Sequence, residues 1–505
     1  MKAAGYIFRS LGYYRIAYLG VLLGAILGAM VLLGALFAGD SVEKSLRQIG
    51  ANRTGQATHL IASGDRFFRT ELAADLVRAA PVRIAPVLYA RGTATPASGR
   101  GTANQVQLVG VTDAFWQLAP TPTSVPLDAL KSTVAINGPL ARRLGIQIGD
   151  TVIVRLQKPG ILSGNAPVAG GESTLESLRC VVAAIVDDAA FGRFSLETTQ
   201  VAQPSVFLPI QLLQDRIKQP ANANLLLIDT GKAEVDLTRL LADTVQLADY
   251  GLALKWHEAA AAFDLTATRI FLEQSVATAV TAALPTAQPV LSYLVNEFRV
   301  GDKSTPYSIG TATTSQAAPF LPADLGPREI VLNQWLADDL AATPGDDVRL
   351  TYFQSGDAGA LIEQTATFRV RSIIPLEGLA ADRGWMPDFP GISDVDSTSD
   401  WDPGLPLDLG KIRGQDDRYW ENYRGAPKAF LSLAAGRAMW STRWGTLTAL
   451  RIPAERSHEP SVRVHALGKQ DDHVSVLQGA SDRRVDRRQV ALVGAVDEDR
   501  AHARS

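Results

Sequence analysis

The run Val134-Ala-Ile-Asn-Gly-Pro-Leu-Ala141 returns 196 residues later as Ile330-Val-Leu-Asn-Gln-Trp-Leu-Ala337. The match continues without a gap through a Gly-Asp pair, Gly149-Asp150 in the first copy and Gly345-Asp346 in the second, into a further apolar run. Asn, Gly and Asp recur in place together with the apolar residues, which makes chance agreement a poor explanation. The chain therefore contains an internal repeat, and both copies predict the same kind of structural unit.

Each copy of the repeat has the pattern of a strand, a short helix and a returning strand. Asn137 and Asn333 suit the helix N-terminus, where an Asn side chain accepts a free backbone N–H. The Gly-Asp pairs suit the tight turn before the returning strand. A further β-rich run follows in each copy, at Leu178–Ile185 and at Ala366–Ile374. We therefore predict an α+β body with two related β-rich units.

The body divides into five ranges on this interpretation. Residues 39–129 form a polar stalk and the first part of the body, 130–215 the first repeat unit, and 216–325 a connecting helical part. Residues 326–455 form the second repeat unit with an acidic and aromatic loop, and 456–505 form a polar tail. Within these ranges, periodicity predicts one helix over Phe67–Arg78 and a long one over Ala259–Leu284.

Residues 17–38, near the N-terminus, are apolar or glycine throughout. As a helix these 22 residues span about 33 Å, which matches a bilayer core of about 30 Å. Lys2, Arg9 and Arg15 precede the segment, and Asp40 follows it. The positive-inside rule then predicts that residues 1–16 are cytoplasmic and that the chain after Asp40 lies outside.

A cleaved signal peptide is the competing interpretation of this segment. Its apolar part would be about 7–15 residues long and would end in a small-x-small cleavage site. The apolar stretch here is longer, and Ala35-Leu-Phe-Ala38 has the wrong spacing for cleavage. We favour an uncleaved transmembrane anchor.

Three glycines recur every fourth residue in the apolar segment, at Gly20, Gly24 and Gly28. On a helix they share one face, and such a groove lets another helix approach closely. These residues are therefore a candidate helix-packing site. Glycine is also common in membrane helices without any such role, and the sequence leaves both interpretations open.

The sequence contains no recognisable catalytic, metal-binding or cofactor-binding motif. His-Glu-x-x-His, Gly-x-Ser-x-Gly and the phosphate-binding loop are all absent. Cys180 is the only cysteine and lies in an apolar run, which predicts a buried thiol in a strand. The run Asp394–Asp400 begins like a calcium loop but lacks the glycine and the distant Glu, so we favour a solvated acidic loop. A formal net charge of -3 gives no reason to expect a nucleic-acid partner.

Several stretches, taken in order, resemble the FtsX-like (MacB-type) permeases of ABC transporters, in the long variety with a large exported domain after the first membrane helix. Together they cover roughly residues 5–450. They are Tyr13-Tyr-Arg15, Ala38-Gly-Asp-Ser-Val42, Asp65-Arg-Phe-Phe68, Thr305-Pro-Tyr-Ser308, the two repeat copies and Tyr423-Arg-Gly-Ala-Pro-Lys-Ala-Phe430.

The resemblance implies a MacB-like periplasmic core domain behind a single N-terminal transmembrane helix, in a bacterial inner (plasma) membrane. It also implies that the connecting part, 216–325, is porter-like and that smaller β-rich parts accompany it. It also implies a cytoplasmic ABC ATPase and a full-length permease as partners, in a homo- or heterodimer. In the family, ATPase motion is transmitted through the membrane to the exported domain, and the permease itself carries no catalytic residues and no cofactor.

The sequence departs from the family after the exported domain. Such permeases carry at least three more membrane helices, and a cytoplasmic loop among them contacts the ATPase. The late apolar run Val490–Val496 is too short to span a membrane. We therefore hypothesise a truncated or frameshifted gene product, with 456–505 in a non-native reading frame, which could not couple to ATP by itself.

Three functions follow from these patterns. The favoured one is a non-enzymatic permease subunit, or its remnant, whose exported domain binds substrate or envelope partners. The second is an independent membrane-anchored binding or adaptor module, which would not co-purify with an ATPase and a full-length permease. The third is an anchored envelope hydrolase, which would show clustered carboxylates with strongly shifted pKa values in a deep cleft.

Overall fold

The computed structural model describes residues 9–10, 12–99, 101–157, 175–197, 201–355, 361–389, 391–402, 405–442 and 444–453, and the backbone of three later strands. Those strands are β20 (Val462–Leu467), β21 (Ser475–Gln478) and β22 (Val493–Glu498), where β20 pairs with β22 and β21 pairs with β1. Apart from them, the predicted polar tail lies outside the described residues.

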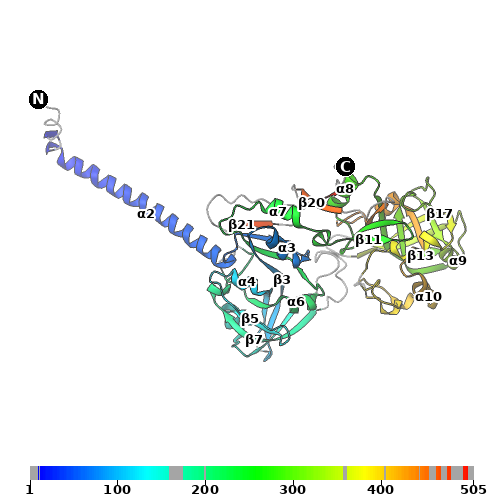
Figure 1. Cartoon of the computed structure of the whole chain (residues 1–505), viewed down its shortest axis with the longest axis horizontal. Coiled ribbons are helices and arrows are strands. Elements are labelled where there is room, and N and C mark those ends of the chain that lie inside the picture. The colour runs from blue at the N-terminus through cyan, green and yellow to red at the C-terminus, as the bar shows by residue number, and fades with distance from the viewer. Residues whose placement is uncertain are drawn as a thin grey trace, which may run out of the picture.

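The N-terminal segment is one continuous helix, α2 (Arg15–Thr54), of 40 residues. Its stretch Arg15–Val42 is long and apolar enough to cross a membrane, with a mean hydropathy of 2.6 over its most apolar window. The same helix continues beyond the apolar segment to Thr54. Figure 1 shows α2 projecting from one side of the first β-rich unit, with the second unit beyond the first. The apolar side chains of the segment are exposed, as a lipid-facing surface would be.

The first unit is built on a sheet with the strand order β21-β1-β10-β3-β4-β8-β5-β7-β6. β3 pairs with β6 as well as with β4, so the six strands from β3 to β6 close into a barrel. Its strands are β1 (His59–Ala62), β3 (Arg83–Pro96), β4 (Ala103–Val111), β5 (Thr133–Asn137), β6 (Thr151–Gln157), β7 (Leu175–Val186), β8 (Ser205–Pro209) and β10 (Leu225–Asp229). Its helices are α3 (Glu71–Ala79), α4 (Asp113–Gln117), α5 (Gly138–Leu144) and α6 (Ile210–Ile217).

The second unit repeats this sheet strand for strand, in the order β11-β12-β19-β13-β14-β18-β15-β17-β16. Here β13 pairs with β16 and closes the second barrel. The strands are β11 (Leu252–His257), β12 (Ala262–Ala267), β13 (Gln288–Val300), β14 (Lys303–Thr313), β15 (Glu329–Asn333), β16 (Asp347–Ser355), β17 (Leu361–Ile374), β18 (Ala429–Ser432) and β19 (Ala449–Pro453). The helices are α8 (Gln274–Ala283), α9 (Gln334–Leu340), α10 (Gly414–Tyr423) and α11 (Leu433–Trp440).

The predicted repeat is confirmed in its local structure. Asn137 and Asn333 cap α5 and α9, accepting hydrogen bonds from the backbone N–H groups of Leu140 and Leu336. Gly149 and Gly345 adopt φ values of +94° and +101° in the turns that follow, a conformation that glycine adopts without strain. Both short helices bury a Leu-Ala pair and a later Leu.

The duplicated unit is larger than the ranges predicted for it. The sheets run from β1 to β10 and from β11 to β19, so most of 216–325 belongs to the two units. The long helix expected over Ala259–Leu284 was wrong, because Ala262–Ala267 is strand β12, paired with β11 and β19, and only Gln274–Ala283 is helical. The helix predicted over Phe67–Arg78 begins at Glu71, since Phe68–Arg69 form the short strand β2, which pairs with β9 (Asn222–Ala223).

A short linking segment joins the two units. It contains α7 (Leu237–Thr244) and the 3-10 turn η2 (Leu247–Tyr250). Arg69 donates from Nη2 to Asp249 at 2.8 Å, and Arg269 lies 3.0 Å from Asp65. These ion pairs fasten the start of β11 and the end of β12 to the first unit.

The two units differ most in one connection. Eighteen residues link β7 to β8 in the first unit, whereas 54 residues link β17 to β18 in the second. The longer connection, residues 375–428, is called the insertion below. It holds α10 and the short 3-10 turns η4 (Gly378–Ala381), η5 (Arg383–Trp385), η6 (Thr398–Asp400) and η7 (Leu409–Lys411). In the first unit, the described residues of this connection contain the 3-10 turn η1 (Asp188–Ala190).

Candidate functional site

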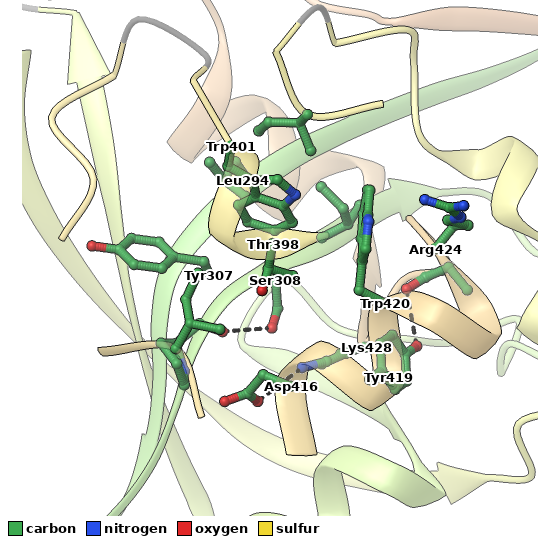
Figure 2. Close-up of a pocket in the computed structure, with 15 residues that line it drawn as sticks. Leu294, Tyr307, Ser308, Thr398, Trp401, Asp416, Tyr419, Trp420, Arg424 and Lys428 are labelled. Atoms are coloured by element: carbon green, nitrogen blue, oxygen red, sulfur yellow. Dashed lines mark hydrogen bonds and ion pairs between the residues drawn. The ribbon is translucent and has the colours of Figure 1, made fainter. Parts of the chain in front are cut away.

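The insertion packs against the outer side of the second barrel through an aromatic cluster. Leu294, Tyr307 and Ile309 come from β13 and β14, and the insertion supplies Ile392, Trp401 and Trp420. The two Trp rings meet edge to face, with centroids 5.0 Å apart. Figure 2 shows these rings around a small pocket above Lys428.

Lys428 is buried at the base of this cluster. Its ammonium lies 3.6 Å from Asp416, 4.0 Å from the centre of the Trp335 ring and 4.6 Å from that of Tyr419. Removal from water disfavours the charged form, and burial lowers the pKa of Lys428 to about 8. Figure 2 shows Lys428 and Asp416 facing each other below the aromatic rings.

A second set of charges ties the insertion to helix α9. Arg413 binds Asp416 through Nε at 2.7 Å and Nη2 at 2.9 Å, and reaches Asp339 at 2.6 Å. Burial by itself raises the pKa of Asp339, but hydrogen bonds from Arg413 and Thr305 outweigh it and hold that pKa below its usual value. The insertion is therefore fixed to the barrel by a charged network as well as by aromatic packing.

A larger cleft, of about 490 Å³, lies between the insertion and the end of β11. One wall is the end of β11, with Lys255, Trp256 and His257. The other wall is the insertion, which contributes Arg383, Gly384, Trp385, Met386, Asp388, Asp394, Asp396 and Arg424 among others. The volume is in the range of ligand-binding sites, about 300–1,000 Å³.

Beside the cleft lies a buried ionic cluster. Arg451 on β19 donates to Asp264 on β12 from Nε at 2.9 Å and from Nη2 at 2.8 Å, and the two residues are only 3% and 2% exposed. The Arg451 guanidinium also lies 3.9 Å from the centre of the Trp385 ring. Its Nη1 is buried without a hydrogen-bond partner among the described residues.

His257 extends this cluster to the cleft. Its Nε2 lies 3.3 Å from Asp264 and its Nδ1 lies 3.4 Å from Asp382. Burial by itself raises the pKa of Asp382, but the His257 contact and the Gly384 N–H outweigh it and lower that pKa. A Cβ on Gly384 would come within 1.6 Å of the His257 ring, so glycine is needed where the insertion crosses the imidazole.

The first unit has an apolar pair in place of this salt bridge. Leu60 pairs with Leu227 across β1 and β10 in the register in which Asp264 pairs with Arg451 across β12 and β19. Both leucines are buried among apolar neighbours. The same position of the duplicated sheet is thus apolar in the first unit and ionic in the second. The second unit is also the one that carries the insertion and the cleft.

The residues singled out from the sequence lie elsewhere. Around Gly20, Gly24 and Gly28 no described atom comes within 4 Å of where a Cβ would stand, and their role in helix packing stays a prediction. Cys180 is buried in the first barrel, as predicted, and burial raises the pKa of its thiol to about 12. In the acidic loop, Asp394 accepts from the Gly391 N–H and Asp396 pairs with Arg424 at 2.6 Å.

Sequence reasoning missed Asp264, Arg451 and Lys428. A signal was present for the first two, because each is a lone charge in a short apolar run, Ala262-Phe-Asp-Leu265 and Ala449-Leu-Arg-Ile452. Burial of such a charge requires a partner, and the partner is 187 residues away. Where carboxyl pKa values are shifted in the described part of the chain, at Glu297, Asp339, Asp346 and Asp382, they are lowered. A general acid requires the opposite shift.

The fold is a β-rich domain that follows an apolar N-terminal helix. Comparison with known families identifies the class of this domain. Residues 19–249 match the family model of the MacB-like periplasmic core domain. Residues 19–249 therefore form a domain of the MacB-like periplasmic core kind. The matched range runs from the apolar helix through the first unit, and the second unit repeats the strand order of the first.

Two solved structures are similar to parts of the chain. The periplasmic region of MacB from Actinobacillus actinomycetemcomitans matches at 11% identity and a TM-score of 0.24, over 37% of this chain and 85% of that chain. The extracellular domain of the noncanonic ABC-type transporter YknZ from Gram-positive bacteria matches at 12% identity and a TM-score of 0.25, over 37% and 93%. A comparison with curated proteins found no match.

Proposed function

We propose that the protein is a non-enzymatic permease-type subunit of an ABC transporter, anchored in a bacterial inner membrane with its N-terminus in the cytoplasm. The exported body binds substrate or envelope partners, and a cytoplasmic ABC ATPase and a full-length permease are its partners in the membrane. The observation that supports this most directly is the family match over 19–249, which joins the apolar helix and the first unit in one domain.

The glycine face of α2 is a suitable contact site for a helix of the second membrane subunit. Gly20, Gly24 and Gly28 lie on one side of the apolar part of α2, and close approach of two membrane helices relies on such small residues. On this proposal, the groove receives a membrane helix of the partner permease.

Purification of the tagged full chain from its own membranes tests the proposal. We expect an ABC ATPase and a permease to co-purify in fixed ratio. Gly24→Leu should reduce recovery of the permease, because the larger side chain blocks the groove. Ala29→Leu is the matched control, since at 100° per residue position 29 lies near the opposite face of the helix, and it should leave recovery unchanged. Purification of the chain without either partner would refute the assignment.

The orientation has its own test in a Cys180→Ala background. A cysteine in place of exposed Lys131 should react with a membrane-impermeant maleimide in intact spheroplasts, whereas one in place of Lys2 should react only after lysis. The reverse pattern would place the body in the cytoplasm.

A further inference from the structure

One wall of the 490 Å³ cleft is the edge of a sheet. β11 is the last strand of the second sheet and pairs with β12 alone in the described part of the chain. Over Ala253–His257 the described backbone makes no backbone–backbone hydrogen bond beyond those to β12. An edge strand of this kind presents a row of unpaired N–H and C=O groups, which is a template for a further strand.

In the described part of the chain, no ion pair or backbone hydrogen bond joins the first unit to Lys255, Trp256 or His257. The contacts between the units gather at the other end of β11, where Leu252 pairs with Ala267 and the nearby Arg269 reaches Asp65 at 3.0 Å. Lys255, Trp256 and His257, which line the cleft, are at the far end of the strand. A strand added there would enter the cleft, which the insertion also lines.

The side chains of the cleft indicate what such a strand would carry. Trp256 is 52% exposed, and its ring is held by an edge-to-face contact with Phe263 at 4.9 Å between centroids. It therefore offers a fixed aromatic surface for an apolar or aromatic side chain.

The charged side chains that line the cleft are Lys255, Arg383 and Arg424 together with Asp388, Asp394 and Asp396. Lys255 pairs with Asp388, and Arg424 pairs with Asp396. Arg383 lines the cleft, is exposed, and has no acidic partner in the part of the chain that the structure describes. An acidic side chain of the incoming strand is the complement that this arginine lacks.

We propose that the edge of β11 and the cleft beside it form a docking site for an extended segment of a partner polypeptide, which pairs its backbone with β11, packs an apolar or aromatic side chain on Trp256 and sets an acidic side chain against Arg383. Strand addition with flanking side-chain pockets is a known mode of peptide recognition. The insertion makes the site specific to the second unit, because the equivalent connection of the first unit has only 18 residues.

This inference rests on the proposed role of the exported body as a binding surface, but not on the ATPase. The test uses the full chain in nanodiscs and a short dye-labelled peptide of alternating valine and threonine with one central tryptophan and a neighbouring glutamate. Binding is measured by fluorescence anisotropy. Two N-methylated forms of the peptide test for backbone pairing. In the first form the N–H groups along one edge of the peptide strand are methylated, and in the second form those along the opposite edge are methylated.

We expect the peptide to bind and one N-methylated form to bind about tenfold more weakly, since it loses the hydrogen bonds to β11, while the other binds unchanged. Replacing the glutamate by lysine should weaken binding about fivefold, as should Arg383→Glu in the protein. Trp256→Ala should weaken binding as well. Arg143→Glu and Leu130→Ala, exposed residues of the first unit, are the matched controls and should have no effect.

Equal binding of both N-methylated peptides, or equal binding of the glutamate and lysine peptides, would overturn the proposal. So would the absence of binding. If no peptide binds and the chain instead forms dimers that Trp256→Ala dissociates, the occupant is a second copy of the chain and the proposal is wrong. None of these results changes how much ATPase and permease co-purify with the chain. The proposed function is therefore tested independently of the docking site.

Discussion

Replacing the buried Asp264–Arg451 pair by the leucines of the first unit tests how this cluster stabilises the second unit. The perturbation is a cycle of three variants: Asp264→Leu, Arg451→Leu and the double variant. Leu60 and Leu227 hold the same register in the first sheet, so the double variant has a natural template in the same chain.

The expected magnitudes follow from burial. Asp264 and Arg451 are 2% and 3% exposed and share two hydrogen bonds. Each single variant leaves the other charge buried without its partner, which costs about 3–5 kcal/mol. The double variant removes both charges, and its remaining cost, from the lost contacts to His257 and Trp385, is about 1–2 kcal/mol. The coupling energy is therefore at least about 4 kcal/mol.

The assay is denaturant unfolding of the full chain in nanodiscs, with hydrogen exchange of the β12 and β19 peptides to report on the second unit. An exposed pair provides the control cycle. Arg369 and Asp347 lie 3.8 Å apart with side chains 69% and 64% exposed, and their coupling should be below about 1 kcal/mol. Additive effects of the two leucine substitutions, or single variants that each cost under about 1 kcal/mol, would refute the reasoning.

Three other predictions concern the charge, caps and thiol of the body. Burial lowers the pKa of Lys428 to about 8, so between pH 8 and the ordinary lysine pKa the unfolded chain binds more protons than the folded chain. The free energy of unfolding should therefore rise with pH in this range, by up to ~1.4 kcal/mol per pH unit. Thermal unfolding of the native chain and of Lys428→Met at several pH values should show that the rise is lost in the variant. Asn137→Ala and Asn333→Ala should each destabilise their own unit by about 2–3 kcal/mol in urea unfolding, since each loses a cap and leaves buried polar groups unpaired; a loss in only one would contradict the equivalence of the copies. Cys180, buried and with its pKa raised to about 12, should react with maleimide only in denaturant, and fast labelling of the native chain would contradict its position in the barrel.

Most of the local structure could be predicted from the sequence because it depends on neighbouring residues. The caps at Asn137 and Asn333, the Gly-Asp turns and the strands that follow them are set by contacts within a few residues. The internal repeat contains the Asn cap and the Gly-Asp turn in both copies. The family resemblance agrees with the match over 19–249.

The helix expected over Ala259–Leu284 shows where local patterns fail. Its alanines and leucines favour a helix as an isolated segment, but Ala262–Ala267 lies between two partner strands. Sheet pairing with β19, more than 180 residues later, decides the conformation. Propensity is a weak preference that tertiary contacts override.

By itself, the amino-acid sequence determined the apolar segment, the duplication and the buried thiol, because hydropathy, repetition and short-range hydrogen bonds are all visible along the chain. Only the tertiary structure decided that Asp264 meets Arg451, that Lys428 is enclosed by aromatic rings and that β11 forms one wall of a cleft. Those features require residues far apart in the chain to meet, and the free energy of a buried charge or an open strand edge depends on what surrounds it in space.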